Sequence, residues 1–577
     1  MLKYTVENKF KELSWLSGLF LVLALLIIGR LFVIQIMQRD YYATMALDTH
    51  EIYQKLHPTR GQIYFQDSRT GIEYPAAVNR QYYQIFVVPS EIKLEDVASS
   101  TQILMDILQL PEDKKDDLIK KLSKENDPYE LVAKKITEEK MTEVMAVGMK
   151  GVYQIPEIYR YYPEDNWSAG VLGFCSMDTE ENLTGNYGVE GYWNKILSGQ
   201  SGFLFGERAA RGGWISLAGM TSMAAENGAD LVLTIDRALQ YQACSRLKKG
   251  MEEYGAINGS LVMLDPNNGA ILAMCSVPDY DPNNYSKVDD LSVYNNTAIF
   301  TPYEPGSVFK PVVMSIALDL NLINPNTTYN DPCSRQFGPY TIHNASEKCY
   351  GNGVTMTQVL ENSINTGMIW VEEKIERKIL KEYIEKFGFG EKIGVPLDME
   401  MPGNILSLND KSPIYAAQAS FGQGLTVTPL QLAQAYSVFA NQGKMYQPQL
   451  VKEIRYTDGR REKIDPKLIG QIISPRTAKM IGAMLTSVVE KTYWRTVKLD
   501  KYYVAGKTGT AQIPGLGGYK EETNHTFGGF APATNPKFVI VIKFEAPERQ
   551  WAESTTAAIF KDLAQFALNY YGVKGDR

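Results

Sequence analysis

The segment Glu304-Pro305-Gly306-Ser307-Val308-Phe309-Lys310-Pro311 contains a Pro-Gly pair that is followed by a serine and, three residues later, by a lysine. Proline and glycine interrupt regular structure, so Ser307 is expected to open a helix. Lys310 then lies one turn further along the same helical face. A lysine in a half-buried site can lose its proton and accept one from a neighbouring hydroxyl. The pattern therefore makes Ser307 a candidate nucleophile and Lys310 its candidate base.

The pattern S-x-x-K is weak evidence by itself. It recurs from Ser90 to Lys93 and from Ser245 to Lys248, and about two matches are expected by chance in a chain of average composition. The alternative is a serine that caps a helix, followed by a lysine on the surface. Only four histidines are present. So few histidines argue against a histidine-based triad and against a histidine-rich metal site. A nucleophile in this chain therefore needs a base other than histidine.

Two further motifs follow downstream. Ser363-Ile364-Asn365 lies in a region of helical pattern from Met356 to about residue 378, where the hydroxyl and the amide could relay a proton and hold a substrate amide. S-x-N also occurs from Ser407 to Asn409, so it too is weak alone. The motif Lys507-Thr508-Gly509-Thr510 occurs once, in a β-rich segment. Its lysine and its hydroxyls could bind a carboxylate of a ligand, and its glycine leaves room for a ligand backbone beside the strand. The alternative is a turn that is bracketed by glycines.

The pattern around these motifs predicts an α/β domain built on an antiparallel sheet. Residues 231–236 predict a strand that leads into a helix, and residues 258–277 predict a hairpin that turns at 265–269. A helix is expected over 428–443, three strands within 502–547, and a last helix over about 554–570. Strands first, helices in the middle and strands last indicate one layered domain.

The N-terminal part of the chain contains an apolar stretch, residues 15–37, which Arg30 and Gln35 interrupt. Its length suits one membrane span. Lysines within residues 1–14 predict a cytoplasmic N-terminus, with the rest of the chain outside the membrane. The alternative is a cleaved signal peptide, but no A-x-A-like site follows the apolar core. Residues 40–85 predict short strands, and the charged residues 90–148 predict a helical subdomain.

Composition narrows the function classes. Lys plus Arg total 59 and Asp plus Glu total 66, a net charge of −7, which argues against a nucleic-acid surface. None of the five cysteines forms a C-x-x-C pair, which argues against a zinc ribbon or a thioredoxin-type site. Cys333 and Cys349 either close a short loop by a disulfide or remain free thiols. The other three, Cys175, Cys244 and Cys275, lie in apolar stretches and are expected in the core.

The order and spacing of S-x-x-K, S-x-N and K-T-G resemble those of the class B penicillin-binding proteins, the D,D-transpeptidases of the peptidoglycan wall. Further similar segments are Arg60-Gly61-Gln62-Ile63, Arg160-Tyr161-Tyr162-Pro163, Gly188-Val189-Glu190-Gly191, Leu233-Thr234-Ile235-Asp236 and Val427-Thr428-Pro429-Leu430-Gln431. The resemblance is good from about 150 to about 545 and thinner over 30–85. Residues 90–148 carry no motif of the family.

This resemblance implies an α+β multidomain chain. It comprises a cytoplasmic tail (1–14), a single transmembrane helix (15–37), an elongated, mostly β pedestal of the dimerisation type (38–224) and a transpeptidase domain (225–577). A helical insert at about 90–148 interrupts the pedestal. The transpeptidase domain is expected to have the penicillin-binding and β-lactamase-like fold, with a central antiparallel sheet flanked by helices.

The resemblance also implies a mechanism. Ser307 attacks the carbonyl between the two terminal D-Ala residues of a stem peptide, Lys310 takes its proton, and Ser363 passes a proton to the leaving D-Ala. Asn365 holds the peptide amide, and the segment from Lys507 through Thr508 and Gly509 to Thr510 binds the terminal carboxylate. Backbone N–H groups of Ser307 and Thr510 form the oxyanion hole. No metal or cofactor is implied.

The implied partners are peptidoglycan stem peptides, β-lactam antibiotics that acylate the same serine, the membrane, and a SEDS-type glycosyltransferase. A β-lactamase or a D,D-carboxypeptidase on the same fold stays open as an alternative, although no base for rapid deacylation is identifiable. A non-catalytic β-lactam sensor is the other alternative. The fact that all three motifs are intact argues against it. A glycosyltransferase is weaker, because residues 40–224 resemble the class B pedestal.

Overall fold

The computed structural model describes residues 23–37, 51–124, 127–178, 182–207, 221–493, 496–515 and 518–577. The chain forms two compact units, Met1–Pro58 with Gly199–Asn227, and Thr59–Ser198 with Gly228–Arg577. Neither unit is continuous in sequence, because each is built from segments on both sides of a segment of the other. The domain boundary predicted near residue 224 stays a prediction.

The first unit contains a three-stranded antiparallel sheet. Its strands, in sheet order, are β1 (Glu51–Leu56), β8 (Gly202–Glu207) and β9 (Thr221–Met223). Residues 23–32 are α-helical, and a π-helical turn, η1 (Val33–Met37), continues them. Residues 15–22 of the predicted membrane span lie outside the described residues. Within the described ranges, no helix has both the length and the apolar character for a membrane crossing.

The second unit contains a seven-stranded sheet that combines early and late segments of the chain. Its order is β19-β18-β10-β2-β3-β4, and β5 pairs with β3. The strands are β2 (Ile63–Gln66), β3 (Glu73–Val87), β4 (Glu130–Ile136), β5 (Val152–Tyr161), β10 (Asp230–Asp236), β18 (Val451–Arg455) and β19 (Arg461–Lys463). The strands β10 and β2 run parallel, whereas the other pairs are antiparallel.

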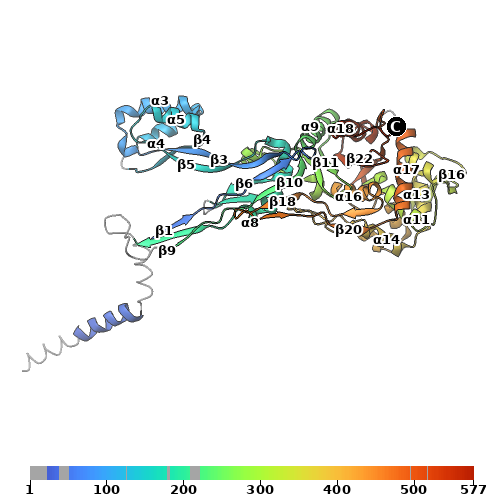
Figure 1. The fold of residues 1–577 in the computed structure, drawn as a ribbon, viewed down its shortest axis with the longest axis horizontal. Helices are drawn as coiled ribbons and strands as arrows, with labels where there is room; N and C mark the ends of the chain where they lie inside the picture. The colour runs from blue at the N-terminus through green and yellow to red at the C-terminus, as the bar shows by residue number, and fades with distance from the viewer. Residues whose placement is uncertain are drawn as a thin grey trace, which may run out of the picture. The chain divides into compact units, whose positions relative to one another are not determined.

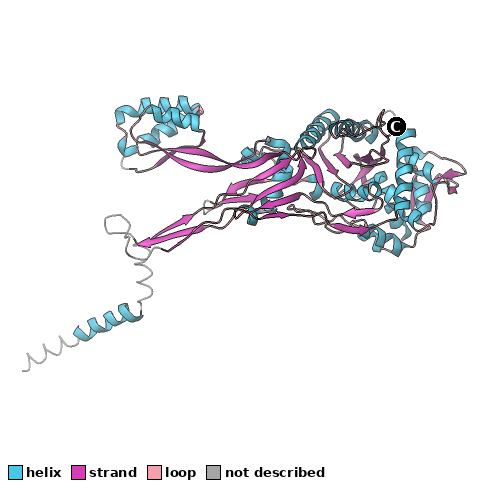
Figure 2. Cartoon of the chain, in the orientation of Figure 1, coloured by secondary structure: helices cyan, strands magenta, loops and turns pink. Residues whose placement is uncertain are grey.

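The predicted helical subdomain is confirmed in part. Its helices are α3 (Val97–Leu108), α4 (Lys115–Leu122) and α5 (Glu138–Ala146), and Figure 2 shows them gathered beside the long strands β3 and β5. They bury Leu104, Leu118 and Val144 in one cluster with Ile85 and Val87 of β3. The strand β4 was not predicted, because four of its seven residues, Glu130, Ala133, Lys134 and Lys135, are of types that are depleted in strands.

A buried ion triad lies between the early segments of the second unit. Glu190 is fully buried, and its carboxylate accepts hydrogen bonds from Arg60 Nη2 at 2.6 Å and from Arg160 Nε at 2.7 Å. Glu190 belongs to the short helix α7 (Gly188–Tyr192), and Arg160 belongs to β5. Three of the segments that resemble the family, those with Arg60, Arg160 and Glu190, are thereby joined through one carboxylate.

The five-stranded antiparallel sheet of the second unit has the order β12-β11-β23-β22-β21. The strands are β11 (Asn258–Leu264), β12 (Ile271–Val277), β21 (Ala505–Gly515), β22 (Gly518–Ala531) and β23 (Phe538–Glu545). The predicted hairpin and the three C-terminal strands are confirmed. Every residue of β23 but the last is buried, since helices cover both faces of the sheet.

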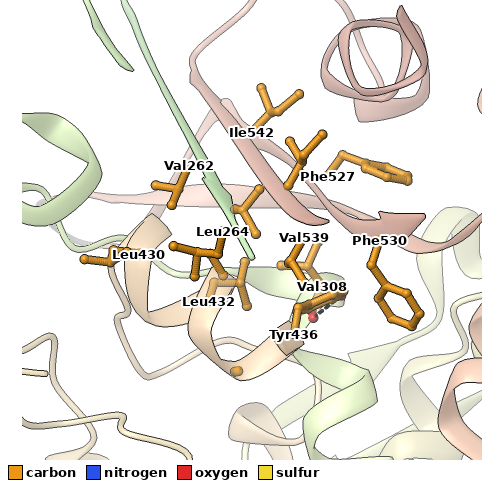
Figure 3. Close-up of a cluster of buried hydrophobic side chains, with 14 of the residues drawn as sticks. Val262, Leu264, Val308, Leu430, Leu432, Tyr436, Phe527, Phe530, Val539 and Ile542 are labelled. Carbon is orange, nitrogen blue, oxygen red and sulfur yellow. Dashed lines mark hydrogen bonds between the residues drawn. The ribbon is translucent and has the colours of Figure 1, made fainter. Parts of the chain in front are cut away.

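Helices α9 (Arg237–Tyr254) and α18 (Thr556–Tyr570) contact each other and the sheet, and α16 (Pro429–Ala440) packs on the opposite face (Figure 1). The two faces follow from neighbouring residues of β22: Phe527 contacts Phe560 of α18, whereas a Cβ on Gly528 would meet the ring of Tyr436 of α16 at 3.0 Å. Figure 3 shows Leu430, Leu432 and Tyr436 of α16 among the buried side chains of the sheet.

Local sequence explains where these helices begin. The Asp236 carboxylate accepts hydrogen bonds from the first free N–H groups of α9, which ends at Gly255 in the left-handed conformation with φ +63°. Thr428 and Gln431 form a capping box at the start of α16, and Pro429 occupies its first turn. Both predicted helices are confirmed.

The remaining elements are shorter or surround the sheet. The helices are α6 (Ala169–Leu172), α8 (Asn194–Leu197), α10 (Thr297–Phe300), α11 (Lys310–Asp319), α12 (Met356–Glu361), α13 (Asn365–Glu372), α14 (Arg377–Lys386), α15 (Pro413–Ala419) and α17 (Pro475–Lys491). The strands are β6 (Phe174–Met177), β7 (Leu183–Asn186), β13 (Thr328–Tyr329), β14 (Ser334–Phe337), β15 (Tyr340–His343), β16 (Val354–Thr355), β17 (Lys444–Tyr446) and β20 (Leu468–Gln471).

Two disulfides join four of the five cysteines. Cys333 pairs with Cys349, which settles the alternative that the sequence left open. Cys244 of α9 pairs with Cys275 of β12. These two were expected only as core residues; they are buried, but the prediction missed their bond because the helix and the strand meet only in the fold. Cys175 is a buried free thiol.

Candidate active site

Ser307 lies on a tight turn, η8 (Gly306–Phe309), that leads directly into α11. The prediction that Ser307 opens a helix is confirmed, although the first turn is a 3-10 helix. Gly306 has φ +61°, and its N–H donates to Gly422 O at 2.9 Å. A Cβ on Gly422 would lie 2.1 Å from Gly306 O, so both glycines are required by the close backbone contact. Tyr436 Oη donates to Val308 O at 2.8 Å and attaches the turn to α16 (Figure 3).

Lys310 is fully buried, and its side chain joins the first two motifs. Its Nζ lies 2.6 Å from Ser363 O, 2.8 Å from Asn365 Oδ1 and 3.2 Å from Ser363 Oγ. Ser363 Oγ is in turn 2.9 Å from Ser307 Oγ and donates to it. Ser307, Ser363 and Lys310 therefore form one continuous chain of hydrogen bonds.

The helix predicted from Met356 to about residue 378 is wrong at the S-x-N motif. The α-helix α12 ends at Glu361, α13 begins at Asn365, and Ser363 between them has φ +54°. Thr492 Oγ1 at the end of α17 donates to Glu361 O at 2.9 Å. A backbone carbonyl of the last turn is thus occupied by another helix. No proline or glycine marks the break in the sequence, and tertiary contacts produce it.

The K-T-G motif lies on strand β21, with Lys507 fully buried. Lys507 Nζ donates to Tyr493 Oη at 2.9 Å and to Thr508 O at 3.2 Å. A Cβ on Gly509 would lie 2.7 Å from Pro305 O. The backbone next to Ser307 therefore fills the space beside this glycine, where the sequence had suggested a ligand backbone.

The hydroxyls of Thr508 and Thr510 meet a short turn, η11 (Ala552–Ser554), that precedes α18. Thr508 Oγ1 lies 2.7 Å from Tyr493 Oη and 3.3 Å from Glu553 Oε1. The N–H of Ala552 donates to Thr510 Oγ1 at 3.3 Å. Tyr493 and Glu553 were not predicted, because they belong to no motif and reach the strand only in the folded chain.

Electrostatics favour the neutral form of the Lys310 amine. Burial lowers the pKa of its amine well below the ordinary value of 10.5, and the positive charge of Lys507 lowers this pKa further. A neutral amine has two N–H donors and one lone pair. Ser363 O and Asn365 Oδ1 can only accept, so they take the two N–H groups and leave the lone pair for a hydroxyl. In its neutral form, this amine is placed to accept a proton from a serine hydroxyl.

The structure thus brings the predicted site residues together from distant parts of the chain. Lys310, Ser363 and Asn365 are in direct contact, and Ser307 joins them through Ser363. The strand β21 contacts η8 through Gly509. Asn365 Nδ2 also donates to His343 O at 3.0 Å, a contact with β15 that the sequence did not suggest.

Comparisons with known proteins identify two family domains in the chain. The penicillin-binding protein transpeptidase domain matches residues 259–565, and the penicillin-binding protein dimerisation domain matches residues 55–233. The chain is 32% identical over 570 residues to stage V sporulation protein D of Bacillus subtilis, covering 96% of this chain and 85% of the relative. It is 34% identical over 442 residues to a probable peptidoglycan D,D-transpeptidase, PbpC, of Pseudomonas aeruginosa, covering 75% of this chain and 74% of the relative.

Among solved structures, penicillin-binding protein 2X from Streptococcus thermophilus shares the fold with a TM-score of 0.75 at 22% identity, covering 91% of this chain and 81% of that chain. The transpeptidase match alone spans more than half of the 577 residues. The chain belongs to the class B penicillin-binding proteins, the peptidoglycan D,D-transpeptidases.

Proposed function

We propose that Ser307 is the nucleophile of this transpeptidase and Lys310 its general base. The observation that carries the proposal is the buried amine of Lys310, whose two carbonyl-type acceptors leave its lone pair for a hydroxyl. Lys310 takes the Ser307 proton directly or through the Ser363 hydroxyl, which lies within hydrogen-bond distance of both. The Ser307 oxygen then attacks the carbonyl carbon between the two terminal D-Ala residues of a stem peptide.

The acyl-enzyme forms when the C–N bond to the last D-Ala breaks. The departing amine takes a proton from Ser363, which Lys310 replenishes. Asn365 holds the peptide amide, and backbone N–H groups of Ser307 and Thr510 stabilise the oxyanion, a contribution of ~10²–10³ in rate for one donor. Lys507, Thr508 and Thr510, with Gly509 between them, bind the terminal carboxylate. An amine of a neighbouring stem peptide then attacks the ester, and Ser307 recovers its proton.

β-Lactams are proposed to acylate the same serine. The test is covalent labelling with a fluorescent penicillin, followed by mass spectrometry of the labelled peptide. Wild-type protein is expected to carry one adduct on Ser307, with a burst and then slow release. Ser307→Ala is expected to carry none, whereas the control Ser245→Ala, from the S-x-x-K pattern on α9, is expected to label normally. Undiminished labelling of Ser307→Ala refutes the assignment, and rapid turnover of penicillin favours a β-lactamase.

The membrane placement belongs to the same proposal. Residues 15–37 anchor the chain as one span, residues 1–14 remain cytoplasmic, and the transpeptidase faces the wall, where its substrates are. A SEDS-type glycosyltransferase is the proposed membrane partner. The apolar stretch supports the anchor. Loss of membrane association after deletion of residues 1–37 is the expected result, and an unchanged sedimentation of that variant with membranes contradicts it.

A further inference from the structure

Glu553 places an acid at the end of the site where the proposed function needs to bind a negative charge. It lies on the turn η11, half-buried, and its Oε1 is 3.3 Å from Thr508 Oγ1. The preceding residue of the same turn, Ala552, donates its N–H to Thr510 Oγ1 at 3.3 Å. One turn of the protein therefore contacts both hydroxyls that are proposed to receive the terminal carboxylate of a ligand.

The Thr508 hydroxyl has only one proton to donate. Tyr493 Oη at 2.7 Å and Glu553 Oε1 at 3.3 Å are both within reach of it. An ionised carboxylate can only accept hydrogen bonds. A ligand carboxylate that binds Thr508 must therefore take this proton from Glu553 or from Tyr493, and it must do so next to a second carboxylate.

The neighbouring cation does not remove this conflict. Lys507 Nζ binds Tyr493 Oη and Thr508 O, and its contacts do not include Glu553. Two carboxylates that share one donor repel each other, and the repulsion is strong where side chains are partly removed from water. The site thus contains an internal carboxylate that accepts from the same Thr508 hydroxyl that is proposed to receive the ligand's carboxylate.

We infer that Glu553 is a specificity-determining residue that weakens binding of donors and β-lactams with an ionised carboxylate beside Thr508. The inference rests on the proposed roles of Thr508 and Thr510. Loss of the negative charge at residue 553 removes the repulsion between the two carboxylates and weakens one of the two acceptors that compete with the ligand for the Thr508 proton. A ligand whose carboxylate is esterified has no charge to repel and gains nothing from this change.

The test compares benzylpenicillin with its methyl ester. The second-order rate constant for acylation of Ser307 is measured in wild-type protein and in Glu553→Gln. With the free acid, the variant is expected to react about tenfold faster, the size of one hydrogen bond to a charged group. With the ester, the two proteins are expected to react equally. Glu521→Gln, which removes an exposed acid of β22, is the charge-matched control and is expected to match wild type with both ligands.

Each outcome decides the inference. A rate for the free acid that is unchanged or lower in Glu553→Gln overturns it, and so does an equal gain for acid and ester. A similar gain in Glu521→Gln shows a general charge effect and also overturns it. Glu553→Gly, which removes the side chain altogether, must reproduce the gain. Failure of the proposed function is distinguishable, because wild-type protein would then carry no adduct on Ser307 with either ligand.

Discussion

The Arg60–Glu190–Arg160 triad and the lysine pair of the active site both bury charged groups, but with opposite results. Burial alone would raise the pKa of Glu190, yet the two guanidiniums outweigh it and lower the pKa to about 2. Among the residues that the structure describes, Lys310 forms no ion pair with a carboxylate, and the charge that acts on its pKa is that of another cation, Lys507. One buried group is therefore held ionised, and the other is driven toward its neutral form.

The difference lies in the partners, not in the depth of burial. Glu190 and Lys310 are both fully buried. A paired and hydrogen-bonded charge keeps one protonation state over a wide pH range, so the triad joins segments and performs no chemistry. An amine among neutral acceptors and beside another cation loses its proton at a lower pH than an ordinary lysine.

The largest expected effect follows from removing the unpaired amine. Lys310→Met is expected to lower the rate of Ser307 acylation by ~10³-fold, within the range for loss of a general base. Stopped-flow measurement with a fluorescent penicillin gives the rate constant. The control Lys248→Met removes the lysine of the α9 S-x-x-K pattern, which pairs with Asp279, and is expected to react as wild type. A loss of less than tenfold in Lys310→Met would contradict a base at this position.

The triad is expected to affect stability instead of chemistry. Glu190→Gln leaves two buried guanidiniums without their counter-charge and is expected to cost about 3 kcal/mol of unfolding free energy. Urea unfolding followed by fluorescence measures the loss, with Glu143→Gln, an exposed acid of α5, as the control. In the fraction that remains folded, the acylation rate is expected to stay unchanged. An unfolding free energy of Glu190→Gln equal to that of wild type would show that the triad does not stabilise the fold.

The stability contribution of Glu190 has a defined pH window. Its folded pKa of about 2 is below the ordinary value of 4.5, so the unfolded chain binds the proton first. The contribution is complete above about pH 4.5 and is lost as the pH falls toward 2. Wild-type protein is therefore expected to lose stability more steeply than Glu190→Gln over this window. Parallel unfolding curves of the two proteins between pH 5 and 3 would contradict the assignment.

The acylation rate is expected to depend on pH above the acid range in which Glu190 titrates. The proposed base is the neutral amine of Lys310, so the acylation rate is expected to rise with pH and to reach its plateau below the ordinary pKa of lysine. Lys507→Met removes a neighbouring positive charge and should move the midpoint of this rise to higher pH. The profile is measured with an esterified β-lactam, because such a ligand does not need Lys507 for its carboxylate. A midpoint that moves to lower pH would contradict the coupling of the two amines.

The sequence predicted much of this arrangement, and its failures have a common cause. The order of the motifs predicted Ser307, Lys310 and Lys507, and local pattern predicted the hairpin 258–277 and the helix α16. The break at Ser363 was missed because a contact from α17 creates it, and Tyr493 was missed because no motif contains it. Helix caps and turns depend on residues that are adjacent in the sequence, so they can be predicted from it. A left-handed serine or a phenol that approaches from another element depends on the packing of distant segments.

The smallest expected effect concerns that phenol. Tyr493 Oη receives hydrogen bonds from the Lys507 ammonium and from the Thr508 hydroxyl, and the residue is 3% exposed. Tyr493→Phe keeps the ring and removes the oxygen, so Lys507 loses one of its two acceptors, and the Thr508 hydroxyl is left with Glu553 alone. A loss of about 1 kcal/mol, or roughly fivefold in acylation by a free-acid β-lactam, is expected. The ester should be affected less, because only the free acid uses the Thr508 proton. Equal losses for both ligands would show that Tyr493 supports the structure of the site in general. Its role would then resemble that of the Arg60–Glu190–Arg160 triad, which is expected to affect stability and not chemistry.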